Sequence, residues 1–176
     1  ANIQIYVDSA PGGRIDLFPG TYAQTSPDWG WESAVMLVGE AGPVYGMAHD
    51  SSTRITAGID ARGNPDTDTI VATVSKNILQ GDLASSRLLI VVGSQDGYGQ
   101  GKLRAVDENP STWVAGGGSP PNSQNLEKYH STIWDVLLPE SVNQEEMLGS
   151  YDVEMMTYSK LERALSCHRS NNKCMG

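Results

Sequence analysis

The chain has 176 residues, enough for one domain with a hydrophobic core, and carries 12 basic against 21 acidic residues, a net charge of −9. This balance argues against nucleic-acid binding, which needs Lys and Arg to neutralise phosphates, and against anionic membrane surfaces. No apolar run approaches the roughly 18 residues of a membrane span, and no signal-peptide pattern or initiator Met opens the chain. We expect a mature extracellular protein cut from a longer precursor.

Short apolar runs separated by Gly, Pro, Asp and Asn turns follow one another along most of the chain. This pattern predicts an all-β fold, an antiparallel β-sandwich or barrel. The most apolar run is expected to be a central strand. The predicted strands are Ile3–Val7, Ser33–Val38, Val44–His49, Thr53–Asp60, Thr69–Ser75, Arg87–Val92 (the most apolar) and Ile133–Leu138.

Helix is predicted only near the C-terminal end. Asn143 to Leu148 has the pattern of one or two helical turns, with Asn143 as the N-cap and two acidic residues in the first turn. The apolar residues between Tyr158 and Leu165 share a helical face, which predicts a second short helix over Ser159–Ser166.

The two cysteines, Cys167 and Cys174, lie together in the last residues of the chain. We expect a disulfide that closes a tight terminal loop, which implies an oxidising compartment. Two alternatives stay open. The thiols could be free, or they could hold a metal together with His168, although structural zinc needs a fourth ligand.

Seven strings of the chain together resemble one known family: Ile3–Asp8, Phe18–Gly20, Ser26–Glu32, Val92–Gly99, Trp113–Gly118, Trp134–Pro139 and Ser150–Val153. They are similar to the C-terminal module of bacterial glucodextranase, which also occurs in archaeal amylopullulanases and surface-layer-associated proteins. The resemblance covers roughly Ile3 to Glu154. It implies a DOMON-like, immunoglobulin-like β-sandwich that is non-catalytic, extracellular and tied to carbohydrate or cell-surface attachment.

The resemblance also divides the chain and raises a question about its first strand. We assign residues 1–156 to the β-sandwich module and residues 157–176 to a tail with the short helix and the cysteines. Modules of this type carry further strands before the position of Ile3, so we expect an exposed edge beside the first strand. The missing strands would come in trans, from a separated fragment or a neighbouring subunit. The alternative is that the upstream part is simply not included.

The segment from Gly93 to Gly118 is the strongest candidate for a binding loop. Its glycines let the backbone take conformations that other residues avoid, and it carries aromatic and acidic side chains between them. A loop of this kind suits a sugar face, a metal ion or a neighbouring strand. It has no Lys-Ser/Thr after the glycines, which argues against a phosphate site.

Aromatic side chains are the candidates for sugar binding, because the C–H faces of pyranose rings stack on flat rings. Trp29, Tyr98 and Trp113 are our candidates for such a platform. Packing in the core is the alternative for each of them, because aromatic rings dominate core burial. We expect this core role for Trp31 and Trp134.

Acidic side chains in loops are the candidates for calcium binding. Ca²⁺ takes six to eight oxygen ligands, and Asp66, Asp68 and Asp96 all lie in Gly-, Pro- or Asn-containing loops. The chain has no EF-hand pattern, and Asp is also an ordinary turn residue. A distant alternative is haem, which some DOMON-like sandwiches bind through a Met and a His or Lys. Met47 and His49 share a strand face and could not supply both axial ligands.

No catalytic motif accompanies these candidates. Gly-x-Ser-x-Gly, a Walker loop and His-Glu-x-x-His are all absent, and no pair of carboxylates is singled out for glycoside hydrolysis. We therefore expect a non-enzymatic, extracellular cell-surface module. The first hypothesis is a structural subunit of a filament or surface layer that assembles with itself or a second polypeptide. The alternative is a carbohydrate-binding accessory module of a secreted glycoside hydrolase.

Overall fold

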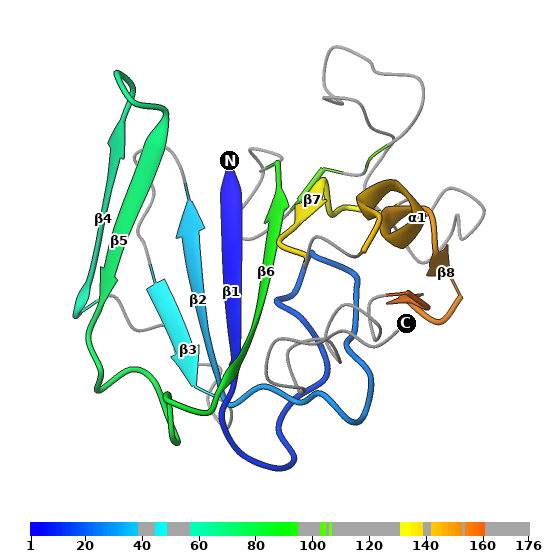
Figure 1. Ribbon diagram of the computed structural model, residues 1–176, viewed down its shortest axis with the longest axis horizontal. Helices are drawn as coiled ribbons and strands as arrows, with labels where there is room; N and C mark the ends of the chain where they lie inside the picture. Colours follow the sequence, from blue (N-terminus) through cyan, green and yellow to red (C-terminus); the bar gives the residue numbers. More distant parts are fainter. Residues whose placement is uncertain are drawn as a thin grey trace.

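A five-stranded antiparallel sheet is the central element of the computed structural model (Figure 1). The structure describes residues 1–38, 45–48, 57–94, 103–104, 106, 131–138, 142–152 and 154–160. The all-β, sandwich-like fold expected from the sequence is confirmed. The strands of the sheet, in their order across it, are β3 (Tyr45–Ala48), β2 (Ser33–Val38), β1 (Asn2–Asp8), β6 (Arg87–Gly93) and β7 (Asp135–Val136).

Strand β1 occupies the middle of this sheet. Ile5 lies opposite Val35 of β2 on one side and opposite Ile90 of β6 on the other. The expectation of an exposed edge beside the first strand is therefore wrong. The apolar segment after Ser86 returns from far along the chain and covers the side of β1 that β2 leaves open. Strand β6 is interior as expected, although β1 holds the central place.

One face of the sheet carries the core. Because side chains alternate along a strand, Tyr6, Met36 and Leu89 point to the same side, and all three are buried. The loop between β1 and β2 folds over this face and brings Phe18 and Trp31 against Tyr6, with both ring-centroid distances from Tyr6 at 5.4 Å. Such aromatic pairs add about 0.5–1.5 kcal/mol each beyond the burial of their area. The core role expected for Trp31 is confirmed.

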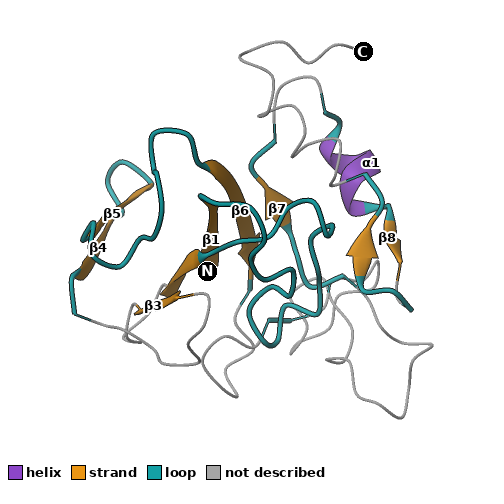
Figure 2. Ribbon diagram, turned by 90° about the horizontal axis from the view of Figure 1, so that it is seen from below, coloured by secondary structure: helices purple, strands orange, loops and turns teal. Residues whose placement is uncertain are grey.

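Smaller elements flank the sheet on two sides (Figures 1 and 2). A hairpin of β4 (Ile59–Asn64) and β5 (Thr69–Val74) lies on the β3 side. Helix α1 (Gln144–Leu148) and the pair β8 (Tyr151–Asp152) and β9 (Thr157–Tyr158) lie on the β7 side. The helix begins as predicted, because the Asn143 side chain accepts a hydrogen bond from the Glu146 amide at 3.0 Å.

Several predicted boundaries differ from the structure. Strand β4 continues to Asn64, where the sequence favoured a loop, because the hairpin turn is confined to the residues after it. There Asn64 Oδ1 accepts a hydrogen bond from the Asp66 amide at 2.9 Å. Strand β7 covers only two residues of the longer predicted run. Thr157 and Tyr158, which we assigned to the tail, form β9, and Tyr158 lies in the core. The predicted terminal helix, Cys167 and Cys174 lie outside the described residues, apart from Ser159 and Lys160.

Candidate functional site

An open polar cleft lies where β1 ends and β6 begins. Its volume is about 790 Å³. Three separate segments form its walls: residues 8–12 after β1, residues 27–30 before β2, and residues 84–87 at the start of β6. We call this site the polar cleft. It exists because antiparallel pairing of β1 with β6 puts Asp8 opposite Arg87.

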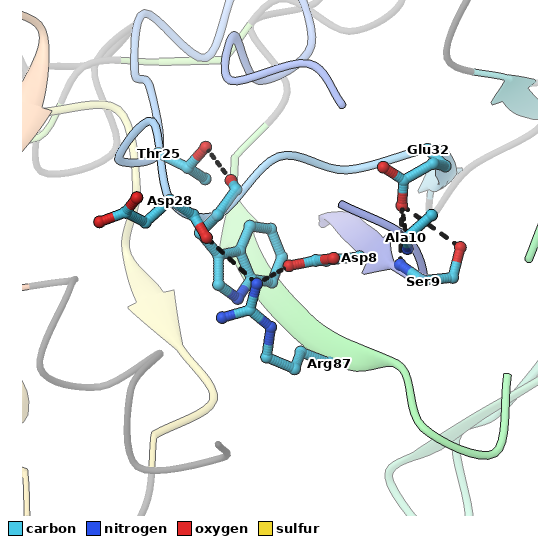
Figure 3. A network of polar contacts seen from close by, with 8 residues as sticks. Asp8, Ser9, Ala10, Thr25, Asp28, Glu32 and Arg87 are labelled. Carbon is cyan, nitrogen blue, oxygen red and sulfur yellow. Dashed lines mark hydrogen bonds and ion pairs between the residues drawn. The ribbon is translucent and has the colours of Figure 1, made fainter. Parts of the chain in front are cut away.

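An ion pair between Asp8 and Arg87 joins two of these walls (Figure 3). Arg87 Nη2 donates hydrogen bonds to Asp8 Oδ2 and to the Asp28 carbonyl, the latter at 3.2 Å. The two paired side chains are only 16% and 8% exposed. The guanidinium carbon also lies 5.7 Å from the centre of the Trp29 ring, within the range of a cation–π contact. The guanidinium is therefore held from three directions.

The wall over residues 27–30 is a tight turn with its own contacts. The Trp29 amide donates to the Ser26 carbonyl at 2.9 Å. Thr25 Oγ1 donates to the Trp29 carbonyl at 2.6 Å, the dashed line at Thr25 in Figure 3. A Cβ atom on Gly30 would lie 1.9 Å from the Gly12 carbonyl oxygen. Only glycine allows the two walls to approach so closely.

The first wall is organised by a buried carboxylate. Glu32 Oε2 accepts hydrogen bonds from the Ser9 amide at 2.7 Å and from the Ala10 amide at 3.1 Å (Figure 3). Glu32 and Arg87 were not predicted as site residues, and Asp8 was considered only as one of several acidic loop residues that could bind calcium. A usable signal was present: Asp8 follows the first strand directly and Arg87 opens the most apolar one, so antiparallel neighbours would bring them together.

The aromatic candidates have mixed outcomes. Trp29 is 1% exposed, beneath Arg87, so its ring has no open face for a sugar in this structure. Tyr98 and Trp113 lie outside the described residues. Trp134 was expected in the core and is instead 40% exposed. It precedes the short edge strand β7, where its amide donates to the Val92 carbonyl at 2.8 Å.

The calcium candidates do not form a group in the part of the chain that the structure describes. Asp66 and Asp68 lie exposed in the β4–β5 turn, and no set of three or more acidic, His or Cys side chains among the described residues could hold a metal ion. Asp96 lies outside those residues, so calcium stays a prediction. The same holds for haem, because His49 and the side chain of Met47 are not described.

A second, apolar groove of about 520 Å³ lies on the outer face of the sheet near β7. Asp135 and Gln144 are its polar lining residues, and aliphatic side chains form the rest. A sugar needs aromatic faces or hydrogen-bonding groups, so the polar cleft is the better candidate for a carbohydrate ligand. The aliphatic lining consists of Ile3, Ile90, Val92, Val136, Leu137, Leu138 and Val142.

Comparison with known proteins agrees with the resemblance noted in the sequence. The family model described as the C-terminal binding module, SLH-like, of glucodextranase matches residues 1–163. A comparison with curated proteins finds no match. Within the described ranges, no helix has the length and apolar character to cross a membrane. Because the family model spans nearly the whole chain, this protein belongs to the family of SLH-like C-terminal binding modules of glucodextranase.

Proposed function

We propose that this chain is a non-catalytic, extracellular module that attaches to polysaccharide at the cell surface, with the polar cleft as its binding site. The observation that carries the proposal is an open polar cleft lined by the planar side chains of Asp8 and Arg87, which their ion pair holds in fixed positions. Planar groups of this kind form paired hydrogen bonds with neighbouring hydroxyls, and positions fixed beforehand lower the entropy cost of binding. Membership of a family of binding modules supports the same role.

Arg87 is the group we expect to contact the ligand. A guanidinium has five N–H donors, and Nη2 serves Asp8 and the Asp28 carbonyl. In Figure 3 the other terminal nitrogen points away from Asp8. That nitrogen can donate to sugar hydroxyls. Asp8 and Asp28 outnumber this single cation, so the cleft suits a ligand rich in hydroxyls better than an acidic polymer.

The same contacts support the non-catalytic part of the proposal. Hydrolysis of a glycosidic bond needs two carboxyl groups that face each other with different proton affinities. In the cleft, Asp8 forms an ion pair with Arg87. This arrangement supports binding without turnover.

The test is a pull-down on insoluble polysaccharide with Arg87→Lys. Lysine keeps a positive charge opposite Asp8 but lacks the planar fork. A lost hydrogen bond from a charged group is worth about 1.5–3 kcal/mol, so we expect binding to weaken at least about tenfold.

Arg62→Lys is the matched control. Arg62 pairs with Asp60 on the β4–β5 hairpin, outside the cleft, and both side chains are exposed. This variant should bind like the unmodified chain. Equal binding by all three proteins would place the ligand elsewhere, and a chain that binds no polysaccharide at all would remove the proposed function.

A structural subunit of a filament or surface layer is the second candidate function. Its first argument was an open edge beside β1, which the sheet order removes. Its remaining support is an exposed aliphatic side chain on each face of β5, where Ile70 and Val71 are 50% and 64% exposed. Exposed aliphatic side chains on a hairpin are typical of contacts with another protein or another copy.

A further inference from the structure

We infer that Glu32 is the positioning residue of the polar cleft: it holds two of the walls in place and does not contact the ligand. Glu32 is only 9% exposed and is not among the residues that line the cleft. The expected effect of Glu32 on polysaccharide affinity rests on the proposed function. Its effect on the backbone of the walls does not, so affinity and backbone order can be measured separately.

The Glu32 side chain fixes the first wall through backbone groups. A single oxygen, Oε2, accepts from two consecutive amides, those of Ser9 and Ala10. Both residues line the cleft. Hydrogen bonds to an ionised carboxylate are shorter and stronger than neutral ones. The backbone of this wall is therefore tied to one buried charge.

The first wall is part of the loop that runs from the end of β1 to Arg14. Both ends of this loop are hydrogen-bonded to the backbone of Glu32 or of Trp31 before it. The Glu32 amide donates to the Val7 carbonyl at 3.0 Å, where the loop begins. Arg14, where the loop returns, exchanges two backbone hydrogen bonds with Trp31, at 3.0 and 2.9 Å. The carboxylate thus occupies the middle of a loop whose start and end are already anchored beside it.

The wall over residues 84–87 is connected to Glu32 through Ser9. Ser9 Oγ lies 2.5 Å from the Gln80 carbonyl, and the Gln80 amide donates to Ser33 Oγ at 2.8 Å. Gly81 packs directly on Ser9, because a Cβ atom there would lie 2.5 Å from Ser9 Oγ. The segment that leads into residues 84–87 therefore takes its position from Ser9, which Glu32 holds.

The two carboxylate oxygens of Glu32 have different surroundings. Oε1 is buried and has no hydrogen-bond partner within the described part of the chain. It lies against Gly13, where a Cβ atom would come within 2.6 Å of it. Only Oε2 does the holding, so glutamine can place its carbonyl oxygen there and its amide nitrogen at the unpartnered position. Glutamine therefore keeps the acceptor, although its hydrogen bonds are weaker than those of the carboxylate and its amide nitrogen is buried without a partner.

The experiment compares Glu32→Gln and Glu32→Ala by two measurements on the full chain: affinity for insoluble polysaccharide, and hydrogen exchange at the Ser9 and Ala10 amides. We expect Glu32→Ala to lose at least about tenfold in affinity and to exchange these two amides about 100-fold faster, with the β1 and β2 amides unchanged. Glu32→Gln keeps the acceptor without the charge, so both measurements should stay within about fivefold of the unmodified chain and well short of Glu32→Ala.

Glu146→Ala is the matched control, because Glu146 is an exposed carboxylate paired with Lys160. It should change neither measurement. If Glu32→Ala does not fold, Glu32→Met removes the acceptor and keeps most of the volume. Unchanged exchange at Ser9 and Ala10 in these variants would overturn the positioning role. So would a loss of affinity in Glu32→Gln equal to that in Glu32→Ala, which would indicate a charge contact with the ligand. Absence of binding by the unmodified chain would end the proposed function and leave the exchange result to decide for Glu32.

Discussion

The phenol of Tyr158 shows how strongly the core acts on a single residue. Its hydroxyl shares a hydrogen bond with Ser131, and its ring packs against Tyr151 with the centroids 4.9 Å apart. Burial raises the pKa of the Tyr158 phenol well above its usual value of 10.0. The hydrogen bond with Ser131 lowers this pKa by less than burial raises it, and Tyr151 adds a still smaller rise. Above pH 10.0, the Tyr158 phenol therefore keeps its proton in the folded protein and loses it in the unfolded chain.

This shift predicts a loss of stability at high pH. The unfolded phenol ionises near pH 10, while the folded one stays neutral, so the contribution of Tyr158 is complete below pH 10 and falls as the pH rises above it. Denaturant unfolding between pH 8 and 11 should show a decline that is smaller in Tyr158→Phe. An identical decline in both proteins would mean that other groups cause it.

At the scale of elements, helix α1 depends on its cap. The helix has five residues and could not persist alone. Its Met147 is fully buried in the core, and Asn143 satisfies the Glu146 amide at the first turn. The cap therefore secures a core contact as well as a hydrogen bond.

We expect Asn143→Ala to lower the free energy of unfolding by about 1 kcal/mol, the usual value of an N-cap side chain. Urea denaturation measures it. Asn77→Ala is the control, because Asn77 is an exposed turn residue whose side chain has no hydrogen bond among the described residues. A change there should stay within about 0.5 kcal/mol, and a loss in the control as large as in Asn143→Ala would show that the cap is not the cause.

Strands and helices that are encoded by patterns of neighbouring residues could be predicted from the sequence. The polar cleft, which forms between distant segments, could not. Alternation and turn residues located β1, β2, β5 and β6, and the Asn143 cap located α1. The polar cleft depends on the pairing register between β1 and β6. This register places Asp8 beside Arg87, which is 79 residues later in the sequence. Trp134 was misplaced for a related reason: its residue type favours the core, but it sits beside the edge strand β7, where 40% of it stays exposed.

At the scale of the whole molecule, the sheet order determines which strand edges can attract a partner. Strand β1 has neighbours on both sides, and the two edge strands of the five-stranded sheet, β3 and β7, have only four and two residues. Short edges are poor templates for another chain.

We therefore expect the 176-residue chain to fold as a monomer at micromolar concentration. Light scattering after size-exclusion chromatography measures its mass. A concentration-dependent rise in mass would favour the structural-subunit role instead. In that case Val71→Lys, which puts a charge on the exposed surface of β5, should lower the mass again.

The central position of β1 also determines when this protein is most prone to pair wrongly with another chain. Strand β1 is synthesised before β2 and β6, gains β2 early, and must wait for β6 before its other side is covered, since Asn2 pairs with Gly93. Contacts between such distant residues form slowly because a long loop has to close. Until then a nascent chain presents a bare apolar strand that another chain can capture. Misassembly should therefore be a hazard of synthesis and refolding, and it should disappear once β6 has docked.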